Sequence, residues 1–308
     1  MTHRPTVQII TPNFLPENNA GTERMLSLYK TFSRKFDVQI VSLTKKGEKK
    51  PANSPIPGLN IRWVEQGQYS GTSFLIRGFY ELWFSLKLSF EASKTPAELR
   101  IISLPFMFLL PAFLVWMPHA RIIADIRDIV WEYLDDSTPW QRLTKRIIRW
   151  VMVNSLQRCE LIVVTNEAEK ATLEKVLPAQ QIMLVSNGIS RCRYAAVADL
   201  TPPEYTGVLK VLVCGNIGKV LDLQVLMLAV KDRQDIEVEV VGGGNELASL
   251  RQFKEQHELK NIYFHGEQPF EKLRAYYESS HLLFLQVDRK STRLNSSHSQ
   301  QSRMPSSA

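Results

Sequence analysis

Short runs of β-branched and other apolar residues recur along the chain, and segments with helical spacing separate most of them. Most of the runs lack strict apolar–polar alternation, which is typical of strands covered on both faces. The predicted strands are residues 7–11, 37–43, 59–64, 99–103, 120–125, 160–165 and 181–187. The predicted helices are residues 21–35, 73–93, 140–158 and 166–176. This order predicts an α/β fold built on a doubly wound parallel sheet.

The alternation pauses at residues 198–207, where "ADLTPPEYTG" contains two prolines and a glycine and indicates a linker. It then restarts, with predicted strands at 209–215, 236–242, 262–265 and 281–287 and helices at 222–230, 246–257 and 269–279. We therefore expect two Rossmann-like domains, at residues 1–197 and 208–287. Ligands of such sheets bind beyond the carboxyl ends of the strands.

One apolar segment complicates this picture. Residues 101–118, "IISLPFMFLLPAFLVWMP", are 18 uncharged residues, near the lower limit for a membrane span. The segment starts like a strand and contains Pro105, Pro111 and Pro118. We therefore predict a buried strand followed by a buried helix.

Composition excludes several classes of protein. The formal charge of +7 falls to about +4 when residues 288–308 are set aside, and there is no arginine-rich stripe with interleaved aromatics, so nucleic acid is not an expected partner. Cys159, Cys192 and Cys214 lie far apart, which argues against a disulfide framework or a zinc site. The N-terminus leads straight into a strand-like run without signal-peptide architecture. We expect a cytoplasmic location.

Two predicted helical stretches, residues 74–90 and 141–158, mix aromatic, aliphatic and basic side chains. Basic amphipathic helices can lie on anionic membrane surfaces. An ordinary core-facing helix with a basic outer side explains the pattern equally well. Both interpretations stay open at this point.

Two segments after predicted strands of the first domain carry candidate chemistry. Gly21 opens a helix after the loop "TPNFLPENNAGTER", where backbone N–H groups could approach a phosphate, although many strand-to-helix turns need a glycine. The segment "ADIRDIVWEYLDD" contains Asp125, Arg127, Asp128 and Glu132. A carboxylate there could hold a sugar hydroxyl or accept a proton, and Arg127 could pair with a phosphate. An N-capping aspartate with a solvated acidic face is the alternative.

In the second domain, "CGNIGK" places Gly215, Asn216, Gly218 and Lys219 between a strand and a helix, as in a phosphate-binding loop, but without Walker A spacing. The later "VVGGGNEL" does not match the dinucleotide-binding fingerprint. His119 precedes a strand, at the wrong end for a parallel-sheet site, and no histidine accompanies a nucleophile. A hydrolase triad has no support.

The order of the motifs resembles family-4 glycosyltransferases of the GT-B fold, over residues 5 to about 287. Five stretches carry the resemblance: "PNFLPENNAGTER", "RDIVWE", "VVTNEAEKATL", "VSNGI", and "GNIGK" with the following "VEVVGGGNELASLRQF…NIYFHGEQPFEKLRAYYESSHLLFLQV". "RDxxWE" with "GNIGK" is similar to members that build bacterial surface polysaccharides and lipopolysaccharide O-chains.

The resemblance implies a retaining transfer from a nucleotide-diphosphate sugar to a glycan or lipid-linked acceptor, with no metal and no cofactor. It assigns the diphosphate to Gly21, Gly215, Asn216, Gly218 and Lys219 and gives acceptor-side or sugar-contacting, catalytic roles to Arg127 and Asp128. A non-catalytic sugar- or nucleotide-binding protein and a GT-B nucleotide-sugar epimerase remain alternatives.

The last segment, residues 288–308, has almost no aliphatic side chains and is expected to be disordered. "DRKSTRLNSSH" and "SRMPSSA" resemble the conceptual translation of a short-read sequencing adapter, which predicts a non-native tail. Members of the family continue instead to a pair of glutamates that binds the donor. We therefore expect an incomplete second domain, a natural reading frame that departs from this one near residue 287, and a 308-residue chain that is an inactive fragment.

Overall fold

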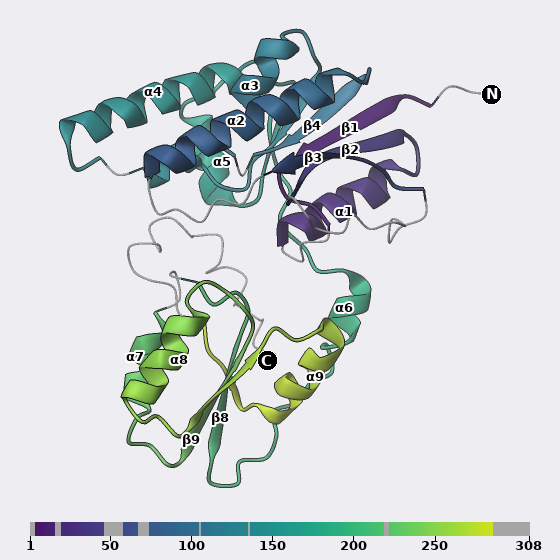
Figure 1. Cartoon of the computed structure of the whole chain (residues 1–308). Helices are drawn as coiled ribbons and strands as arrows, with labels where there is room; N and C mark the ends of the chain where they lie inside the picture. The colour runs from purple at the N-terminus through teal and green to yellow at the C-terminus, as the bar shows by residue number, and fades with distance from the viewer. Residues whose placement is uncertain are drawn as a thin grey trace. The chain divides into compact units, whose positions relative to one another are not determined.

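The computed structural model describes residues 4–15, 20–45, 58–66, 74–104, 106–134, 136–218 and 222–285 (Figure 1). Contacts within the chain divide it into unit 1, which ends at Gly188, and unit 2, which begins at Ile189. The predicted tail at residues 288–308 lies outside the described residues, as does Lys219.

Unit 1 is built on a seven-stranded sheet with the order β3-β2-β1-β4-β5-β6-β7, and every neighbouring pair is parallel. The strands are β1 (Thr6–Thr11), β2 (Asp37–Lys45), β3 (Asn60–Gln66), β4 (Leu99–Ser103), β5 (Ile122–Asp125), β6 (Leu161–Val164) and β7 (Ile182–Leu184). The predicted parallel sheet is confirmed, because each strand overlaps a predicted apolar run.

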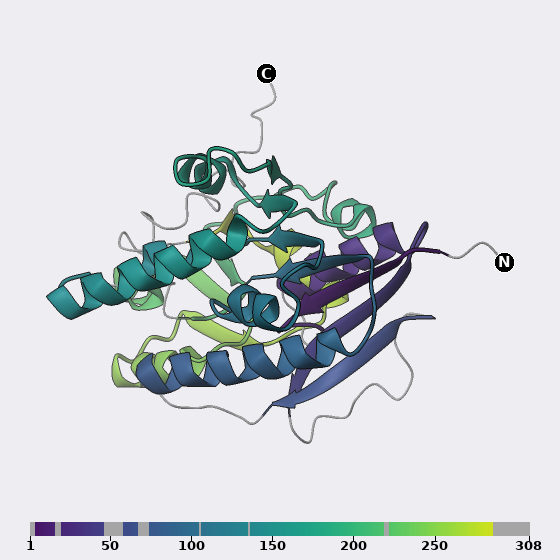
Figure 2. The same cartoon turned by 90° about the horizontal axis from the view of Figure 1, so that it is seen from above.

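Helices cover both faces of this sheet (Figures 1 and 2). They are α1 (Ala20–Phe32), α2 (Phe74–Ser93), α3 (Leu109–Trp116), the 3-10 helix η1 (Val130–Tyr133), α4 (Pro139–Leu156) and α5 (Glu167–Glu174). Successive side chains of a strand point to opposite faces, so Ile9 packs in the core beneath α1 and Ile10 in the core beneath α2, α3 and α4. Both isoleucines are fully buried.

The apolar segment at residues 101–118 forms the end of β4 and the short helix α3. Leu109, Leu110 and Phe113 of α3 are completely buried in the core of unit 1. The prediction of a buried strand followed by a buried helix is confirmed. In the part of the chain that the structure describes, no helix combines the length and apolar character needed to cross a bilayer.

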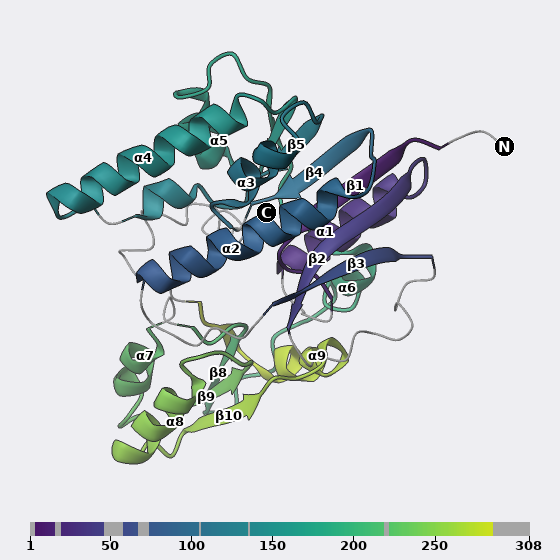
Figure 3. The ribbon, with the colours of Figure 1, turned by 45° about the horizontal axis from the view of Figure 1, so that its top comes forward.

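Unit 2 contains a four-stranded parallel sheet with the order β10-β9-β8-β11 (Figure 3). The strands are β8 (Leu209–Cys214), β9 (Ile236–Val241), β10 (Ile262–Gly266) and β11 (Leu282–Leu283). The helices are α6 (Arg191–Ala195), α7 (Leu223–Ala229), α8 (Leu247–Gln256) and α9 (Phe270–Ser279). Helices α7 and α8 pack on one face of the sheet, through Leu223, Met227 and Leu250.

The short helix α6 lies in the segment that the sequence assigns to the end of the first domain. Arg274 of α9 donates a hydrogen bond to the carbonyl oxygen of Ala196 (2.7 Å) and pairs with Asp199 (3.1 Å). These contacts attach the segment to unit 2, so the division at Gly188 falls before the predicted linker at residues 198–207.

Candidate functional site

The candidate residues lie where parallel strands end. Because all strands of one sheet run in the same direction, their carboxyl ends form a single edge in each unit. In unit 1 this edge carries the segments after β1, β5, β6 and β7. In unit 2 it carries the segments after β8, β9 and β10.

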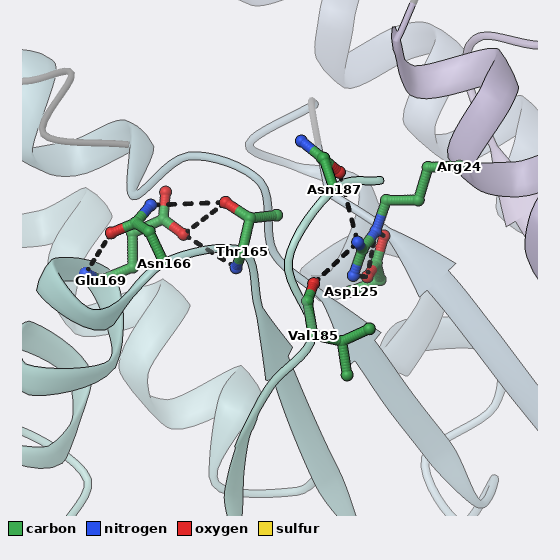
Figure 4. A network of polar contacts seen from close by, with 7 residues as sticks. All are labelled: Arg24, Asp125, Thr165, Asn166, Glu169, Val185 and Asn187. Atoms are coloured by element: carbon green, nitrogen blue, oxygen red, sulfur yellow. Dashed lines mark hydrogen bonds and ion pairs between the residues drawn. The ribbon is translucent and has the colours of Figure 1, made fainter. Parts of the chain in front are cut away.

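The best-defined polar contact at the edge of unit 1 joins Arg24 of α1 to Asp125, the last residue of β5 (Figure 4). Arg24 Nη2 lies 2.6 Å from Asp125 Oδ1, and Arg24 Nε donates to the same carboxylate at 2.9 Å. Both side chains are buried, with exposed fractions of 7% and 2%. Two charged hydrogen bonds of this kind fix the relative orientation of the planar groups.

The remaining nitrogen of Arg24 reaches the segment after β7 (Figure 4). Its Nη1 donates to the carbonyl oxygen of Val185 (2.8 Å) and to Oδ1 of Asn187 (3.2 Å). Arg24 therefore connects α1, β5 and the "SNG" segment. The sequence suggested that a carboxylate in the segment with Asp125 could hold a sugar hydroxyl or accept a proton, and it did not predict this ion pair. Sequence reasoning missed Arg24, because no spacing rule relates positions that lie 101 residues apart.

Arg127 lies two residues after the end of β5 and is partly buried. Among the described residues, its Nε has no hydrogen-bond partner. Burial lowers the pKa of Arg127, and the negative charges of Asp125 and Asp128 oppose that effect. The segment after β5 therefore places a guanidinium group, with an unused donor, beside two carboxylates.

Asp128 is exposed and lies close enough to Glu169 for their charges to interact. Glu169 is buried in the first turn of α5, where its Oε2 accepts hydrogen bonds from the backbone N–H (3.1 Å) and hydroxyl (3.0 Å) of Thr165. Asn166 caps the helix by accepting the N–H of Glu169 (2.9 Å; Figure 4). Burial raises the pKa of Glu169, the Thr165 hydrogen bonds oppose the rise, and the charge of Asp128 adds to it. Sequence reasoning missed Glu169 as well.

Two further candidate residues of unit 1 lie on helices, and only the helix of Gly21 was predicted. Gly21 is buried in the first turn of α1. Glu132 is exposed on η1. His119 is exposed just before β5, at the amino edge of the sheet, and lines a hollow of about 350 Å³ with Arg100 and Trp116. The structure therefore places His119 away from the carboxyl edge, as predicted.

In unit 2, the loops after β8 and β9 pack backbone against backbone. The Ile217 N–H donates to the Gly243 carbonyl oxygen (2.8 Å), and the Glu246 N–H donates to the Ile217 carbonyl oxygen (3.1 Å). A Cβ atom at Gly242 would lie 1.8 Å from the Gly215 oxygen, and one at Gly244 would lie 2.2 Å from the Ile217 oxygen. Gly242 and Gly244 of the "GGG" motif are therefore needed for this packing, a role that sequence reasoning did not assign.

The predicted diphosphate residues of unit 2 lie on the first of these loops. Gly215 has a φ of +145°, a backbone conformation that favours glycine. Asn216 is exposed beside it. Gly218 needs no such conformation, and a Cβ there would make only ordinary contacts, with Asn216 Nδ2 at 3.5 Å and Asn245 Oδ1 at 3.7 Å. Packing within the described residues therefore leaves the glycine at position 218 unexplained.

Chemically, the edge of unit 1 presents a guanidinium group and carboxylates, and the edge of unit 2 presents a glycine-rich loop. A guanidinium and exposed N–H groups suit phosphate oxygens, whereas carboxylates suit hydroxyl groups. Within the described ranges, no cluster of three or more His, Cys, Asp or Glu side chains could hold a metal ion.

Comparisons with known proteins agree with this description. The sequence profile of the family described as "Glycosyl transferases group 1" matches residues 202–291, a segment that contains both glycine loops. No curated protein sequence matches the chain significantly.

Solved structures resemble most of the chain. Sucrose-phosphate synthase from Thermosynechococcus elongatus matches with a TM-score of 0.66 and 13% identity, over 91% of this chain and 75% of that one. Anabaena Alr3699/HepE in complex with UDP and glucose matches with a TM-score of 0.58 and 11% identity, over 91% and 73%. The lipopolysaccharide outer core galactosyltransferase WaaB matches with a TM-score of 0.52 and 10% identity, over 90% and 73%.

The fold is GT-B, with two parallel α/β units of the Rossmann type. The matched domain and these neighbours together support a glycosyltransferase.

Proposed function

We propose that this polypeptide belongs to an enzyme that transfers a sugar from a nucleotide-diphosphate sugar to a glycan or lipid-linked acceptor, with retention of configuration. The observation that carries the proposal is the packed pair of glycine loops after β8 and β9, within the segment at residues 202–291. Such loops let a diphosphate approach backbone N–H groups closely.

The chemical demand on the donor side is a departing diphosphate. As the bond between the sugar and the diphosphate breaks, negative charge grows on the phosphate oxygens and the sugar becomes oxocarbenium-like. In this proposal, the Asn216 N–H and the charge of Lys219 stabilise those oxygens. The Gly215 N–H donates to the Val241 carbonyl oxygen (3.0 Å) and the Gly218 N–H to the Asn216 carbonyl oxygen (3.1 Å), so the two glycines contribute room for the diphosphate rather than free donors. Gly218 fits the role because, among the described residues, a Cβ there would make only ordinary contacts, so packing does not account for the glycine.

The acceptor side of the proposal uses unit 1. The N-terminal turn of α1 at Gly21 contributes partial positive charge toward the diphosphate. Arg127 has an unpaired Nε within the described residues, and Asp128 is the exposed carboxylate beside it. We assign contacts with the transferred sugar or the phosphate to Arg127, and proton acceptance from the acceptor hydroxyl to Asp128. Asp125 is not assigned a role in chemistry, because Arg24 already holds it.

The proposed setting is the synthesis of cell-surface polysaccharide or lipopolysaccharide on the cytoplasmic side of the plasma membrane, with peripheral membrane contact. The outer-core galactosyltransferase among the structural neighbours gives this setting loose support. A metal-independent reaction without a cofactor is part of the same proposal.

The first test is titration of the chain with UDP, GDP and dTDP, followed by NMR of ¹⁵N-labelled glycine amides. We expect weak binding, with a Kd on the order of 1 mM, that perturbs glycines of unit 2 and is lost in Gly218→Val. Gly78→Val is the control, because Gly78 lies on α2 of unit 1 and an added Cβ there has no neighbour within 4 Å among the described residues. Equal binding by wild type and Gly218→Val would contradict the donor assignment.

Incubation with radiolabelled nucleotide sugars and glycan or lipid extracts then tests transfer, and the anomeric configuration of any product tests retention. Binding without a product under all conditions favours the non-catalytic binding protein. Conversion of the donor itself to another nucleotide sugar favours the epimerase. Against the epimerase stands the position of His119, the one histidine in the described part of unit 1, at the amino edge of the sheet.

A further inference from the structure

The outer surface of α2, α3 and α4 is unusually apolar. Of the 22 exposed large hydrophobic side chains of the described residues, eleven belong to these three helices. They are Ile76, Phe79, Leu82, Trp83, Phe90, Val115, Trp116, Trp140, Leu143, Ile147 and Trp150. Single exposed apolar residues are ordinary, but a gathering of this kind marks a surface that binds something.

Tryptophans concentrate on this surface. The chain has six tryptophans, and four of them have exposed fractions of 46–74%: Trp83, Trp116, Trp140 and Trp150. Trp131, by contrast, is buried in the core of unit 1. An indole ring combines a large apolar body with one polar N–H, which suits the interface between water and lipid.

Helix α4 has two apolar sides. Met152 and Leu156 are buried against the core of unit 1, which is what a helix needs to cover a sheet. A second apolar row, formed by Trp140, Leu143, Ile147 and Trp150, is spaced by three and four residues and faces away from that core. Covering the sheet does not require this second row.

The charge of α4 is entirely basic. The helix contains Arg142, Lys145, Arg146 and Arg149 and no acidic residue. Lys145 pairs with Asp136, whereas the three arginines are exposed. Cations also accompany the aromatic rings of the α2 region, where Lys87 lies 5.1 Å from the ring of Trp83 and Lys94 4.8 Å from that of Phe90. Lys94 also pairs with Glu91 of α2 (2.7 Å), so the unpaired basic charge of the surface, among the described residues, is concentrated on the arginines of α4.

The three helices form one continuous surface. Helix α3 contacts both α2 and α4 and lies between them (Figures 1 and 2). The rings of Phe90 on α2 and Trp116 on α3 are 5.1 Å apart, which joins two of the exposed sets directly. The surface belongs wholly to unit 1.

We propose that the outer surface of α2, α3 and α4 docks unit 1 onto an anionic lipid bilayer, with the indole rings in the headgroup region and the arginines of α4 on acidic headgroups. This proposal deepens the peripheral membrane contact of the proposed function and rests on it for the choice of a membrane as the partner. Charge favours the bilayer over a second copy of the chain, because a dimer formed through α4 would bring two wholly basic helices together.

The test is co-sedimentation of the full chain with vesicles of phosphatidylcholine alone and of an equimolar mixture with phosphatidylglycerol. We expect binding to the mixed vesicles that high salt weakens, because salt screens the headgroup charge. Arg142→Gln/Arg146→Gln/Arg149→Gln should lower the partition coefficient on the order of 100-fold. Trp140→Ala/Trp150→Ala should lower it at least about tenfold.

The matched control is Arg251→Gln/Lys260→Gln/Lys272→Gln, which removes three exposed cations from unit 2 and should bind like wild type. Circular dichroism establishes that each variant is folded. The proposal is overturned if the chain does not sediment with mixed vesicles. It is also overturned if the partition coefficient falls equally in the α4 variants and in the control variant. A lipid-free dimer that dissociates in Trp140→Ala/Trp150→Ala also overturns it and assigns the surface to a second copy. Nucleotide titration without vesicles tests the proposed function separately.

Discussion

Arg24 and Asp125 form a buried ion pair in which Nη2 lies 2.6 Å from Oδ1. The pair holds the N-terminal half of α1 against the end of β5, two residues before Arg127. Arg24 also holds the segment after β7 through Val185 and Asn187. One side chain thus fixes three of the segments that surround the candidate acceptor site, which makes it a positioning residue rather than a catalytic one.

Replacement of Arg24 by methionine should destabilise unit 1 by about 3–5 kcal/mol. The carboxylate of Asp125 would remain buried without its cation, and the Val185 carbonyl oxygen would lose its donor. Urea unfolding followed by circular dichroism measures the change in the free energy of unfolding. A loss below about 1 kcal/mol, typical of an exposed ion pair, would show that the pair does not hold these segments.

A double variant separates the pair from the packing of its members. Arg24→Met/Asp125→Leu removes both charges and leaves no unpaired carboxylate. It should be clearly more stable than the sum of the two single variants predicts, since the residues contact each other directly. If the loss of unfolding free energy in the double variant equals the sum of the two single losses, the two side chains are not energetically coupled.

Replacement by alanine should destabilise unit 2 strongly at Gly242, where the loops pack, and hardly at Gly218, where packing does not require a glycine. Gly242→Ala places a Cβ within 1.8 Å of the Gly215 oxygen, at a φ of +142°, and should destabilise unit 2 by about 3 kcal/mol or more. Gly218→Ala meets only ordinary contacts and should change stability by less than about 0.5 kcal/mol. Thermal unfolding of both variants measures the difference. Equal effects would mean that position 218 is also fixed by packing.

Local pattern predicted the strands well, because apolar β-branched runs reflect burial on both faces of a parallel sheet. The run at residues 99–103 predicts β4 in full, and the runs at 37–43 and 236–242 overlap β2 and β9. The five-residue helix α6 lay below what periodicity resolves. Its attachment to unit 2 depends on Arg274, nearly eighty residues later.

The sequence identified candidate site residues by the same local reasoning, but it could not supply their contacts. Gly21, Arg127, Asp128, Gly215, Asn216 and Gly218 were chosen because turn-forming or charged residues follow strands, and their roles stay predictions. Arg24 and Glu169 were missed because their roles depend on partners that only the folded chain brings near. The ion pair of Asp125 could not be predicted for the same reason, since the guanidinium that holds it comes from α1.

The cysteines should differ sharply in reactivity toward iodoacetamide. Burial raises the pKa of Cys159 to about 12, so its thiol stays protonated at neutral pH and is shielded from reagents. Cys192 is exposed on α6. Mass spectrometry after brief alkylation should find Cys192 modified and Cys159 unmodified until urea unfolds unit 1. Rapid modification of Cys159 in the folded chain would contradict its burial.

Glu169 should make the stability of unit 1 depend on pH. Burial raises its pKa above the ordinary value, so in the folded state it binds its proton more tightly than in the unfolded state. The stabilisation is therefore complete below the ordinary pKa and is lost as the pH rises through the raised, folded-state pKa. Glutamine keeps an acceptor for Thr165 but does not ionise. Relative to wild type, Glu169→Gln should gain stability as the pH rises through that window.

Urea unfolding of both proteins between about pH 4 and pH 8 measures this gain. Glu167→Gln is the matched control, because Glu167 is exposed in the same helical turn. Its free energy of unfolding should differ from that of wild type by an amount that does not change with pH. Asp128→Asn should bring the pKa of Glu169 closer to its ordinary value, because the charge of Asp128 contributes to the rise. The pH range over which Glu169→Gln gains stability should then be smaller. If Glu169→Gln instead loses stability relative to wild type as the pH rises, the pKa of Glu169 is lowered by folding rather than raised. The hydrogen bonds from Thr165 would then outweigh burial at this position.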